Sequence, residues 1–538
     1  MNMKRQIMLC VCALCAALTV VGQEPATSRI DRSMNIYYDV MRELDMYYAD
    51  TLDYETLTET SINQMLRHID PYTVYYPKKK DKDLRMLTTG KYGGIGSIIQ
   101  LHPDETEGKK DTSVVIANPY EGKPAQRAGV QAGDVIVSVD DWQARGQSVS
   151  DVSDHLRGEP GTTLQLRVLR EGTADTLCFS IVREDIHLDP IEYTYVFDSV
   201  GYIALSEFTE GSGREFQIAL YHLAEQGARS LIVDLRGNGG GLVDEAVNIL
   251  SNFVPKGTEV VSMRGKDGAN ARSYSTTALP LYPDMPLVVL VDHNSASASE
   301  IVSGALQDLK RATLIGERTF GKGLVQNIRP INYGGHLKVT TARYYLPSGR
   351  CIQAIDYAER QRGNQLHRDT AGGILPDIVL TDSQKVDICY ELYAKNMFFD
   401  YATLYHRTHD SIADPRVFEL TDKEIEAFCD WLETRKFTYT TETSKYYHDV
   451  LEMAKNEDLD EETLRLLTEL EPRLKPDFRE AIRRNQDEVK RYLGAEIVLR
   501  YWYQKGNAAF MLRYDKVLTR AIEELRTNQS VSTETVRE

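Results

Sequence analysis

The chain has 538 residues, enough for about three or four domains of ordinary size. With 42% hydrophobic and 27% charged residues it can bury a large core, so wholesale disorder is excluded. Its net charge of −17 argues against a nucleic-acid surface, because phosphate binding needs clustered Lys and Arg.

Residues 1–22 have the features of a cleaved secretory signal. Lys4 and Arg5 precede an apolar run from Ile7 to Val21, and the run ends at the small residue Gly22. The run is shorter than the roughly 20 apolar residues that a membrane span needs. We therefore expect an exported, periplasmic protein. The alternative is an uncleaved segment that anchors the protein to the membrane.

Cysteine spacing gives no sign of a metal site. Three of the seven cysteines lie in the signal segment. None of the others forms a CxxC pair, so we expect no metal, and their disulfide pairing stays open. These others are Cys178, Cys351, Cys389 and Cys429.

The residue pattern of the chain changes near residue 89. Residues 23–88 show helical spacing of apolar side chains, for example Tyr37, Met41 and Leu44, and Asp70-Pro71 interrupts this pattern. Residues 89–184 contain short β-branched runs punctuated by Gly and Pro. We expect a small helical region followed by a compact β-rich module.

Residues 185–381 alternate strands with helices, which predicts an α/β core. Residues 382–538 are helical, charged and interleaved with aromatic side chains, and we expect them to provide packing and interaction surface. In the core, the predicted strands are 201–204, 230–234, 287–291, 313–315, 324–328 and 336–345, and the predicted helices are 214–226, 298–309 and one that begins at Val243.

The sharpest local signal is the segment NSASASE at residues 294–300, between a predicted buried strand and a predicted helix. A hydroxyl at such a turn lies at the positive end of the helix dipole. Unpaired backbone N–H groups beside it can stabilise an oxyanion. The alternative is a serine-rich helix cap in which Glu300 completes a capping box.

A second signal is the segment GERTFGKG at residues 316–323. It matches most of a Walker A loop, but that loop requires Ser or Thr after the lysine and then a helix. Here Gly323 and a strand follow, so an NTPase is excluded. Burial of Lys322 would lower its pKa and let the neutral amine act as a general base. The alternative is an exposed hairpin lysine.

A third signal is the segment DLRGNGGG at residues 234–241, directly after a strand. Glycines there free backbone N–H groups to point at an anion. Leu242 stands where the dinucleotide-binding pattern GxGxxG needs its last glycine, so a dehydrogenase is excluded. The alternative is a tight strand-to-helix turn.

Together the three segments resemble the C-terminal processing peptidases, the family of the tail-specific proteases. That family shows a DLRxNxGG loop, an SASASE segment and a GKGxVQ segment in this order, and this chain has all three. YYLPSGR at 344–350 and GILPD at 373–377 also match, so the resemblance covers roughly residues 30–380. Gly239 departs from the family, in which many members carry Pro, and this change should loosen the loop.

The resemblance implies a Ser-Lys dyad. The middle serine, Ser297, would be the nucleophile, and Lys322, 25 residues later (322 − 297), would be the general base. Gln326 would orient the lysine. The resemblance also implies backbone oxyanion donors, the N–H of Ala298 and that of Gly240 or Gly241.

The β-rich module resembles a PDZ domain. The segment YGGIG (Tyr92, Gly93, Gly94, Ile95 and Gly96) matches the PDZ carboxylate-binding loop, whose backbone N–H groups form a nest for a chain terminus. The resemblance implies polypeptide substrates whose unstructured, apolar C-termini add as a strand at the sheet edge.

We therefore predict a secreted serine endopeptidase without metal or cofactor. Its implied fold is a multidomain α+β and α/β chain: a crotonase- and ClpP-like α/β peptidase core, a PDZ module, and helical N- and C-terminal regions. The rival function is a catalytically idle PDZ scaffold that presents C-termini to a partner. In members of the family the helical N- and C-terminal regions form dimers. The resemblance therefore implies a homodimer through these regions.

Overall fold

The computed structural model describes residues 26–104, 111–173, 175–268, 271–361, 365, 372–381, 386–457, 459–474 and 476–534. The expected signal segment, residues 1–22, lies outside the described residues. The chain divides into two compact units, one ending at His68 and the other beginning at Ile69. Among the described helices, none combines the length and the apolar character needed to cross a membrane.

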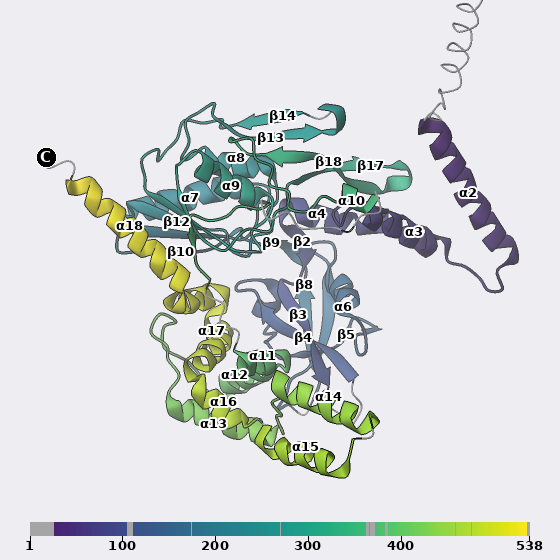
Figure 1. Ribbon diagram of the computed structural model, residues 1–538, viewed down its shortest axis with the longest axis vertical. Coiled ribbons are helices and arrows are strands. Elements are labelled where there is room, and N and C mark those ends of the chain that lie inside the picture. The colour runs from purple at the N-terminus through teal and green to yellow at the C-terminus, as the bar shows by residue number, and fades with distance from the viewer. Residues whose placement is uncertain are drawn as a thin grey trace, which may run out of the picture. The chain divides into compact units, whose positions relative to one another are not determined.

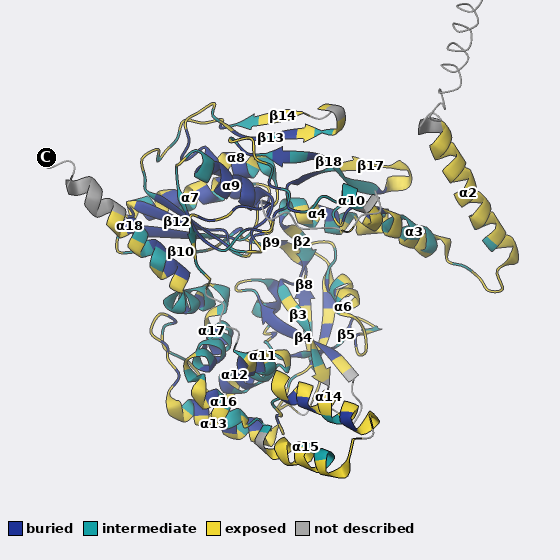
Figure 2. Ribbon diagram, viewed as in Figure 1, coloured by how far each residue is buried: buried dark blue, intermediate teal, exposed yellow. Residues whose placement is uncertain are grey.

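The first unit consists of helix α2 (Ala26–Tyr47) and nearly all of helix α3 (Tyr54–Ile69). These helices confirm the helical spacing predicted from the sequence, and α3 ends directly before Asp70-Pro71, as expected. Most residues of α2, including most of its apolar ones, are exposed (Figure 2). They include Ile36, Val40 and Tyr47, which are 58%, 53% and 76% exposed.

The second unit is built on a six-stranded sheet with the strand order β10-β11-β12-β15-β16-β19. The strands from β11 to β19 run parallel, and β10 is antiparallel at one edge. β12 and β15 are buried along their whole length, as parallel strands covered on both faces must be. This confirms the α/β core. The strands are β10 (Ile191–Phe197), β11 (Val200–Leu205), β12 (Ser230–Asp234), β15 (Leu287–Val291), β16 (Thr313–Gly316) and β19 (Ile378–Val379).

Helices cover both faces of this sheet. Successive strand residues point to opposite faces, and Leu231 and Val233 belong to one apolar cluster while Ile232 belongs to another. The last helix of the chain, from the tail expected to provide packing and interaction surface, covers the second face and completes the core (Figure 1). The helices are α7 (Ser212–Glu225), α8 (Val243–Leu250) and α9 (Ala298–Asp308) on the first face and α18 (Lys516–Glu534) on the second.

A second sheet has the order β1-β18-β13-β14, with β17 paired to β18. Residues 74–76, expected within a helical region, form β1, because the Asp70-Pro71 turn stops the helix and Val-Tyr-Tyr favours an extended strand. The strands are β1 (Val74–Tyr76), β13 (Glu259–Gly265), β14 (Arg272–Ser275), β17 (Leu324–Pro330) and β18 (His336–Tyr345). The short helices are η1 (Lys78–Lys80), α4 (Asp81–Thr89), η3 (Lys266–Gly268), η4 (Asn332–Gly334) and α10 (Ala358–Gln361).

The β-rich module contains a sheet of order β3-β4-β5-β7-β8, with β6 paired to β5 and helix α6 beside β3. β3 lies at the edge of this sheet, so one side of its backbone is open to an added strand. The pair β2–β9 borders the module. The elements are β2 (Lys91–Gly94), β3 (Ser97–Asp104), β4 (Asp111–Pro119), α5 (Pro124–Arg127), β5 (Val135–Val139), β6 (Trp142–Gln143), α6 (Val149–Leu156), β7 (Thr163–Leu169), β8 (Leu177–Val182) and β9 (Glu184–His187).

The C-terminal helices form a body with a separate apolar core and hold the β-rich module. His102 on β3 bonds Asp400 at 2.7 Å, and Gln126 donates to the Tyr503 hydroxyl at 3.0 Å. The helices are α11 (Asp387–Ala394), α12 (Met397–Thr408), α13 (Asp422–Thr434), α14 (Glu442–Asn456), α15 (Glu461–Leu474), α16 (Phe478–Arg484), α17 (Gln486–Met511) and η5 (Leu512–Tyr514).

Candidate active site

Three loops meet at the carboxyl edge of the central sheet, where parallel sheets place their ligands. They are the glycine loop (residues 235–242) after β12, the serine loop (292–297) after β15 and the lysine loop (317–323) after β16. The Ala296 N–H bonds the Asn238 carbonyl at 3.0 Å, and the Phe320 N–H bonds the Ser295 carbonyl at 3.0 Å. The three segments singled out in the sequence therefore lie side by side.

The three serines of NSASASE have different surroundings. The Ser295 hydroxyl donates to the Leu235 carbonyl at 2.8 Å, and the Ser299 hydroxyl donates to the Asn238 carbonyl at 2.9 Å. Both hydroxyls thus tie the serine segment to the glycine loop. Ser297 lies between them, directly before α9, and this position leaves it as the candidate nucleophile.

Ser297 has a strained backbone, with φ of 58° and ψ of −112°. Residues other than glycine rarely adopt positive φ, and this ψ also lies outside the left-handed helical region. Such conformations persist only where the surrounding structure enforces them, and they cluster at active sites. Here the strain accompanies a sharp turn from β15 into α9, which sets Ser297 at the positive end of the helix dipole.

Gly240 of the glycine loop lies directly against Ser297. A Cβ atom at Gly240 would come within 2.7 Å of the Ser297 Cβ and 2.6 Å of the Ala296 carbonyl oxygen, so no side chain fits there. Its φ of 99° also favours glycine. The contact explains why position 240 is a glycine.

The candidate oxyanion donors differ in their hydrogen bonds. The Gly240 N–H already donates to the Asn238 side chain at 2.8 Å. Among the hydrogen bonds of the described residues, none uses the N–H of Gly241 or of Ala298. Ala298 is the first residue of α9, and the first N–H groups of a helix lack intrahelical acceptors. Ala298, next to Ser297 in the chain, and Gly241, next to Gly240, therefore have free donors, whereas the donor of Gly240 is engaged.

Glu300 joins the serine loop to the lysine loop. Its buried carboxylate accepts four hydrogen bonds, and burial still raises its pKa. One oxygen accepts the N–H of Ser297 at 2.9 Å and the N–H of Lys322 at 2.8 Å. The other accepts the Thr319 hydroxyl at 2.6 Å and the Gly321 N–H at 2.8 Å. One side chain thus fixes the backbone on both sides of the candidate dyad.

Lys322 lies in a half-buried, apolar environment. Its Nζ atom is 4.9 Å from the centre of the Tyr72 ring, which the turn before β1 brings to the site. Desolvation lowers the pKa of the Lys322 amine, the nearby Lys338 lowers it further, and Glu300 opposes the shift. The net effect favours the neutral amine, the form that a general base requires.

The lowered pKa predicts the pH dependence of the reaction. With Lys322 in the predicted role of general base, the neutral amine is the active form, and kcat/KM should rise with pH through an apparent pKa below the ordinary lysine value of 10.5. Replacing Lys338 with glutamine removes a neighbouring positive charge, so the rising limb should move to higher pH. The measurement is kcat/KM against pH, with Lys256→Gln, an exposed cation elsewhere, as control. An unchanged limb in Lys338→Gln would contradict the assignment.

Gln326, the predicted partner of Lys322, bonds other groups here. Its side-chain nitrogen donates to the Leu324 carbonyl at 3.1 Å and to the Thr340 hydroxyl at 3.3 Å. Within the described residues, no hydrogen bond joins Ser297 to Lys322 or Gln326 to Lys322. The backbone brings Ser297 and Lys322 to one site through Glu300, but the predicted hydrogen bonds between the side chains are not formed in this structure.

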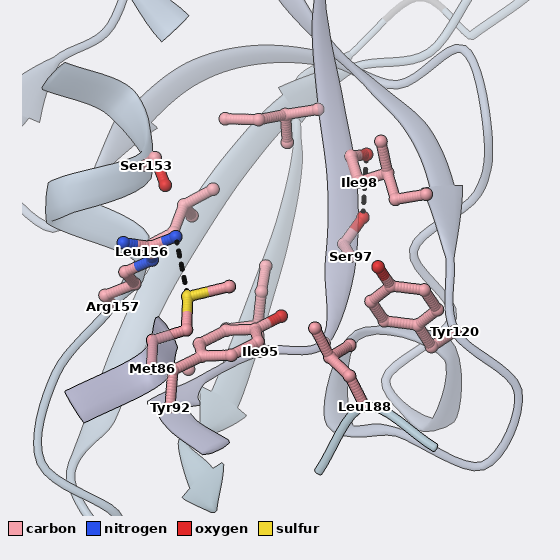
Figure 3. Close-up of a pocket in the computed structure, with 13 residues that line it drawn as sticks. Met86, Tyr92, Ile95, Ser97, Ile98, Tyr120, Ser153, Leu156, Arg157 and Leu188 are labelled. Atoms are coloured by element: carbon pink, nitrogen blue, oxygen red, sulfur yellow. Dashed lines mark hydrogen bonds between the residues drawn. The ribbon is translucent and has the colours of Figure 1, made fainter. Parts of the chain in front are cut away.

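The β-rich module contains a pocket of about 160 Å³ between the edge strand β3 and helix α6. Met86 and Arg157 line one side and Ile98 and Tyr120 the other, with Tyr92 between them (Figure 3). Arg157 lies 5.3 Å from the centre of the Tyr92 ring, and burial raises the pKa of Tyr92 to about 12. The pocket also touches Leu156 and Leu188, so its lining is mostly apolar.

Four of the five predicted carboxylate-loop residues line this pocket: Tyr92, Gly94, Ile95 and Gly96. Gly93 instead packs on Gly158, where a Cβ atom would come within 2.0 Å of the carbonyl oxygen. Among the described hydrogen bonds, the N–H groups of Ile95 and Gly96 have no acceptor. A free pair of adjacent donors at the end of an edge strand suits a carboxylate.

The described residues form neither a cluster of metal ligands nor a disulfide bond. In the described part of the chain, no group of three or more His, Cys, Asp or Glu side chains is arranged to hold a metal ion. The cysteines Cys178, Cys351, Cys389 and Cys429 are unpaired thiols.

Sequence reasoning missed several residues of the site. Glu300 was assigned only to a helix cap, although its spacing from Ser297 was a usable signal. Tyr72 and Met86 precede the peptidase core and the β-rich module in the chain, so no local motif marks them. They reach the two sites through the turn before β1 and through α4.

Comparison with known proteins gives three family matches. Residues 199–379 match peptidase family S41, and residues 115–170 match the PDZ domain. Residues 388–525 match a family described as the C-terminal helical domain of probable PDZ-proteases. The matches fall on the α/β core, on the part of the β-rich module from β4 to β7, and on the C-terminal helices.

Curated relatives align over most of their length. A carboxy-terminal-processing protease of Bartonella bacilliformis is 35% identical over 374 residues, which are 68% of this chain and 80% of the relative. A carboxyl-terminal-processing protease of Synechocystis is 36% identical over 303 residues, 55% of this chain and 69% of the relative. A solved structure of a photosystem II D1 C-terminal processing protease is 31% identical, with a TM-score of 0.36 over 64% of this chain and 86% of its own.

The α/β core, the PDZ domain and the sequence matches define the class: the protein is a serine peptidase that carries a peptide-binding domain. The chain belongs to peptidase family S41, among the C-terminal processing peptidases. This membership favours the peptidase over the idle scaffold and confirms the predicted multidomain fold class.

Proposed function

We propose that the protein is an endopeptidase in which Ser297 is the nucleophile and Lys322 the general base. The observation that carries the proposal is the strained Ser297 at the start of α9, tied through Glu300 to a desolvated lysine. Catalytic hydrogen bonds are often long in the free enzyme and tighten in the substrate complex. The lack of a hydrogen bond between the side chains of Ser297 and Lys322 in the described structure is therefore compatible with their proposed roles.

The reaction is acyl transfer. The neutral Lys322 amine takes the proton of the Ser297 hydroxyl while the oxygen attacks the peptide carbonyl, and the oxyanion binds the free N–H groups of Gly241 and Ala298. The lysine then gives its proton to the leaving amine as the C–N bond breaks. Water, deprotonated by the same lysine, hydrolyses the acyl-enzyme and restores the serine hydroxyl. Gln326 would orient the lysine after leaving its present partners.

We propose further that the PDZ domain captures the C-terminus of the substrate. The free N–H groups of Ile95 and Gly96 would bind the terminal carboxylate, and the last side chain would enter the apolar pocket beside Met86 and Leu156. The chain would pair with the open edge of β3. Unstructured, apolar C-termini are the substrates that this arrangement supports.

Amidation of the substrate separates these two proposals. For an unfolded polypeptide with an apolar end, amidating the C-terminus should raise KM about tenfold and leave kcat unchanged, because charge-assisted hydrogen bonds are lost. An aspartate as last residue should act similarly. Cleavage kinetics of the free and amidated substrates provide the measurement, with Ser297→Ala as the blank. Equal KM values for the free and amidated substrates would contradict the capture role of the PDZ domain alone. Cleavage by Ser297→Ala would contradict the proposed dyad.

We also propose export to the periplasm, on the basis of the signal features of residues 1–22, and a homodimer through the helical ends. The exposed apolar face of α2 supports the second proposal. N-terminal sequencing of the mature protein from the periplasmic fraction tests export, and a retained Met1 would contradict cleavage of the signal.

Sedimentation of the purified protein tests the homodimer, and a monomer would contradict it.

A further inference from the structure

The last helix of the chain holds the glycine loop through Arg236. The Nη2 atom of Arg236 donates to the Asp515 carboxylate at 2.5 Å, and its Nε atom donates to Asp234 at 2.9 Å. Arg236 is the second residue of the glycine loop, and Asp515 directly precedes α18. One guanidinium therefore joins a loop of the candidate active site to the C-terminal helical region.

The cluster around Arg236 is well shielded. The side chains of Asp234 and Asp515 are 7% and 13% exposed, and the Tyr202 hydroxyl donates to Asp234 at 2.8 Å. Burial would lower the pKa of the guanidinium, but the two carboxylates outweigh it and hold the pKa above its ordinary value. The Arg236 side chain itself is 23% exposed, and a partly buried cation that loses one of two carboxylate partners is held less firmly in position.

A series of hydrogen bonds and contacts links Arg236 along the glycine loop to Ser297. The next residue, Gly237, donates its N–H to Asp292 of the serine loop at 3.0 Å. Asn238 then bonds the Leu205 carbonyl and the Gly240 N–H, both at 2.8 Å. Gly240 itself touches Ser297. Arg236 thus fixes the start of a short segment whose end contacts the nucleophile and carries the free N–H of Gly241.

We infer that Asp515 is a positioning residue for the peptidase reaction: by holding Arg236 it keeps the glycine loop in the geometry that the oxyanion requires. The inference rests on the proposed roles of Ser297 and Gly241. Because oxyanion donors act only at hydrogen-bond distance, a loop displaced by about 1 Å can cost up to about 10²-fold in rate. The C-terminal helical region would then be part of the catalytic apparatus.

Two substitutions test this role without removing the start of α18. Asp515 also caps α18, since it accepts the Leu518 N–H at 2.8 Å. Asparagine caps a helix as well as aspartate does, so Asp515→Asn removes the negative charge that pairs with Arg236 and keeps the cap. Asp515→Ser also keeps a capping oxygen but is too short to reach Arg236. The matched control is Asp198→Asn, which breaks the exposed ion pair of Arg526 on the same helix.

The measurements are kcat and KM for a fluorogenic peptide with an apolar C-terminus, the rate of acylation by a fluorophosphonate, and the thermal midpoint of the full-length protein. In both Asp515 variants, kcat and the acylation rate should fall about tenfold with KM within about twofold and a nearly unchanged midpoint. The control should behave as wild type.

The positioning role is overturned if both Asp515 variants keep the wild-type kcat and acylation rate. It is equally overturned if their loss is matched by Asp198→Asn, or if it disappears once activity is corrected for the folded fraction. Failure of the proposed function looks different, because Ser297→Ala would then still cleave the peptide and still react with the fluorophosphonate.

Discussion

Replacing Ser297 with alanine is expected to lower kcat by about 10⁴-fold or more, because the acyl-enzyme can no longer form. The substitution removes one hydroxyl from a side chain that is 7% exposed and leaves the backbone contacts of Ser297 with Glu300 intact. The thermal midpoint should therefore stay close to that of the wild type. Cleavage of an unfolded polypeptide and labelling by a fluorophosphonate measure the effect.

Ser303→Ala is the matched control for this experiment. Ser303 is another buried serine of α9, and its hydroxyl only bonds back to the Ser299 carbonyl at 2.7 Å. This variant should keep the wild-type rate and the wild-type labelling. If Ser297→Ala retained more than about a hundredth of the wild-type kcat, a different residue would have to be the nucleophile.

The second large effect is expected for Glu300→Gln, with kcat reduced about 10²-fold. Each oxygen of Glu300 accepts two donors. In the glutamine side chain, an NH2 group replaces one of these oxygens. It cannot accept the two hydrogen bonds made there, so the NH2 group and the two donors must move apart. A buried donor left without an acceptor costs about 1–3 kcal/mol in the free energy of unfolding. The serine and lysine loops then lose their common hydrogen-bond acceptor, and the proposed dyad loses its alignment.

Glu245→Gln separates loss of alignment from loss of stability. Glu245 on α8 also accepts two backbone N–H groups, from Gly211 at 3.1 Å and Gly213 at 2.8 Å, but it lies outside the three loops. It should lower the thermal midpoint and leave kcat near the wild-type value. Equal losses of kcat in the two glutamine variants would show that Glu300 acts on stability alone.

The sequence predicts the central sheet well because its strands carry strong local signals. The buried run Leu287–Val291 and the strand Ser230–Asp234 were placed to the residue, and α9 to within one residue. Each is an uninterrupted apolar stretch or a long helical period bounded by a clear turn. The motifs at the strand ends could be located for the same reason, since the parallel topology brings strand ends to one edge.

What the sequence does not predict depends on contacts between distant residues. The pairing of β1 with β18, the approach of Tyr72 to Lys322 and the ion pair of Arg236 with Asp515 join segments that no local pattern connects. Side-chain arrangement is a further limit. The motif predicts Gln326 beside Lys322, whereas competing acceptors at Leu324 and Thr340 hold its amide in the structure.

The covering of the sheet by α18 has a consequence for biogenesis. Arg236 and Asp515 are 279 residues apart, and the second face of the peptidase sheet is buried by residues near the end of the chain. A polypeptide emerging from its N-terminus exposes that apolar face until the last helix is made. Until then Arg236 of the glycine loop has Asp234 but not Asp515 as a partner. With the role inferred for Asp515, a chain that ends before α18 should therefore lack full peptidase activity.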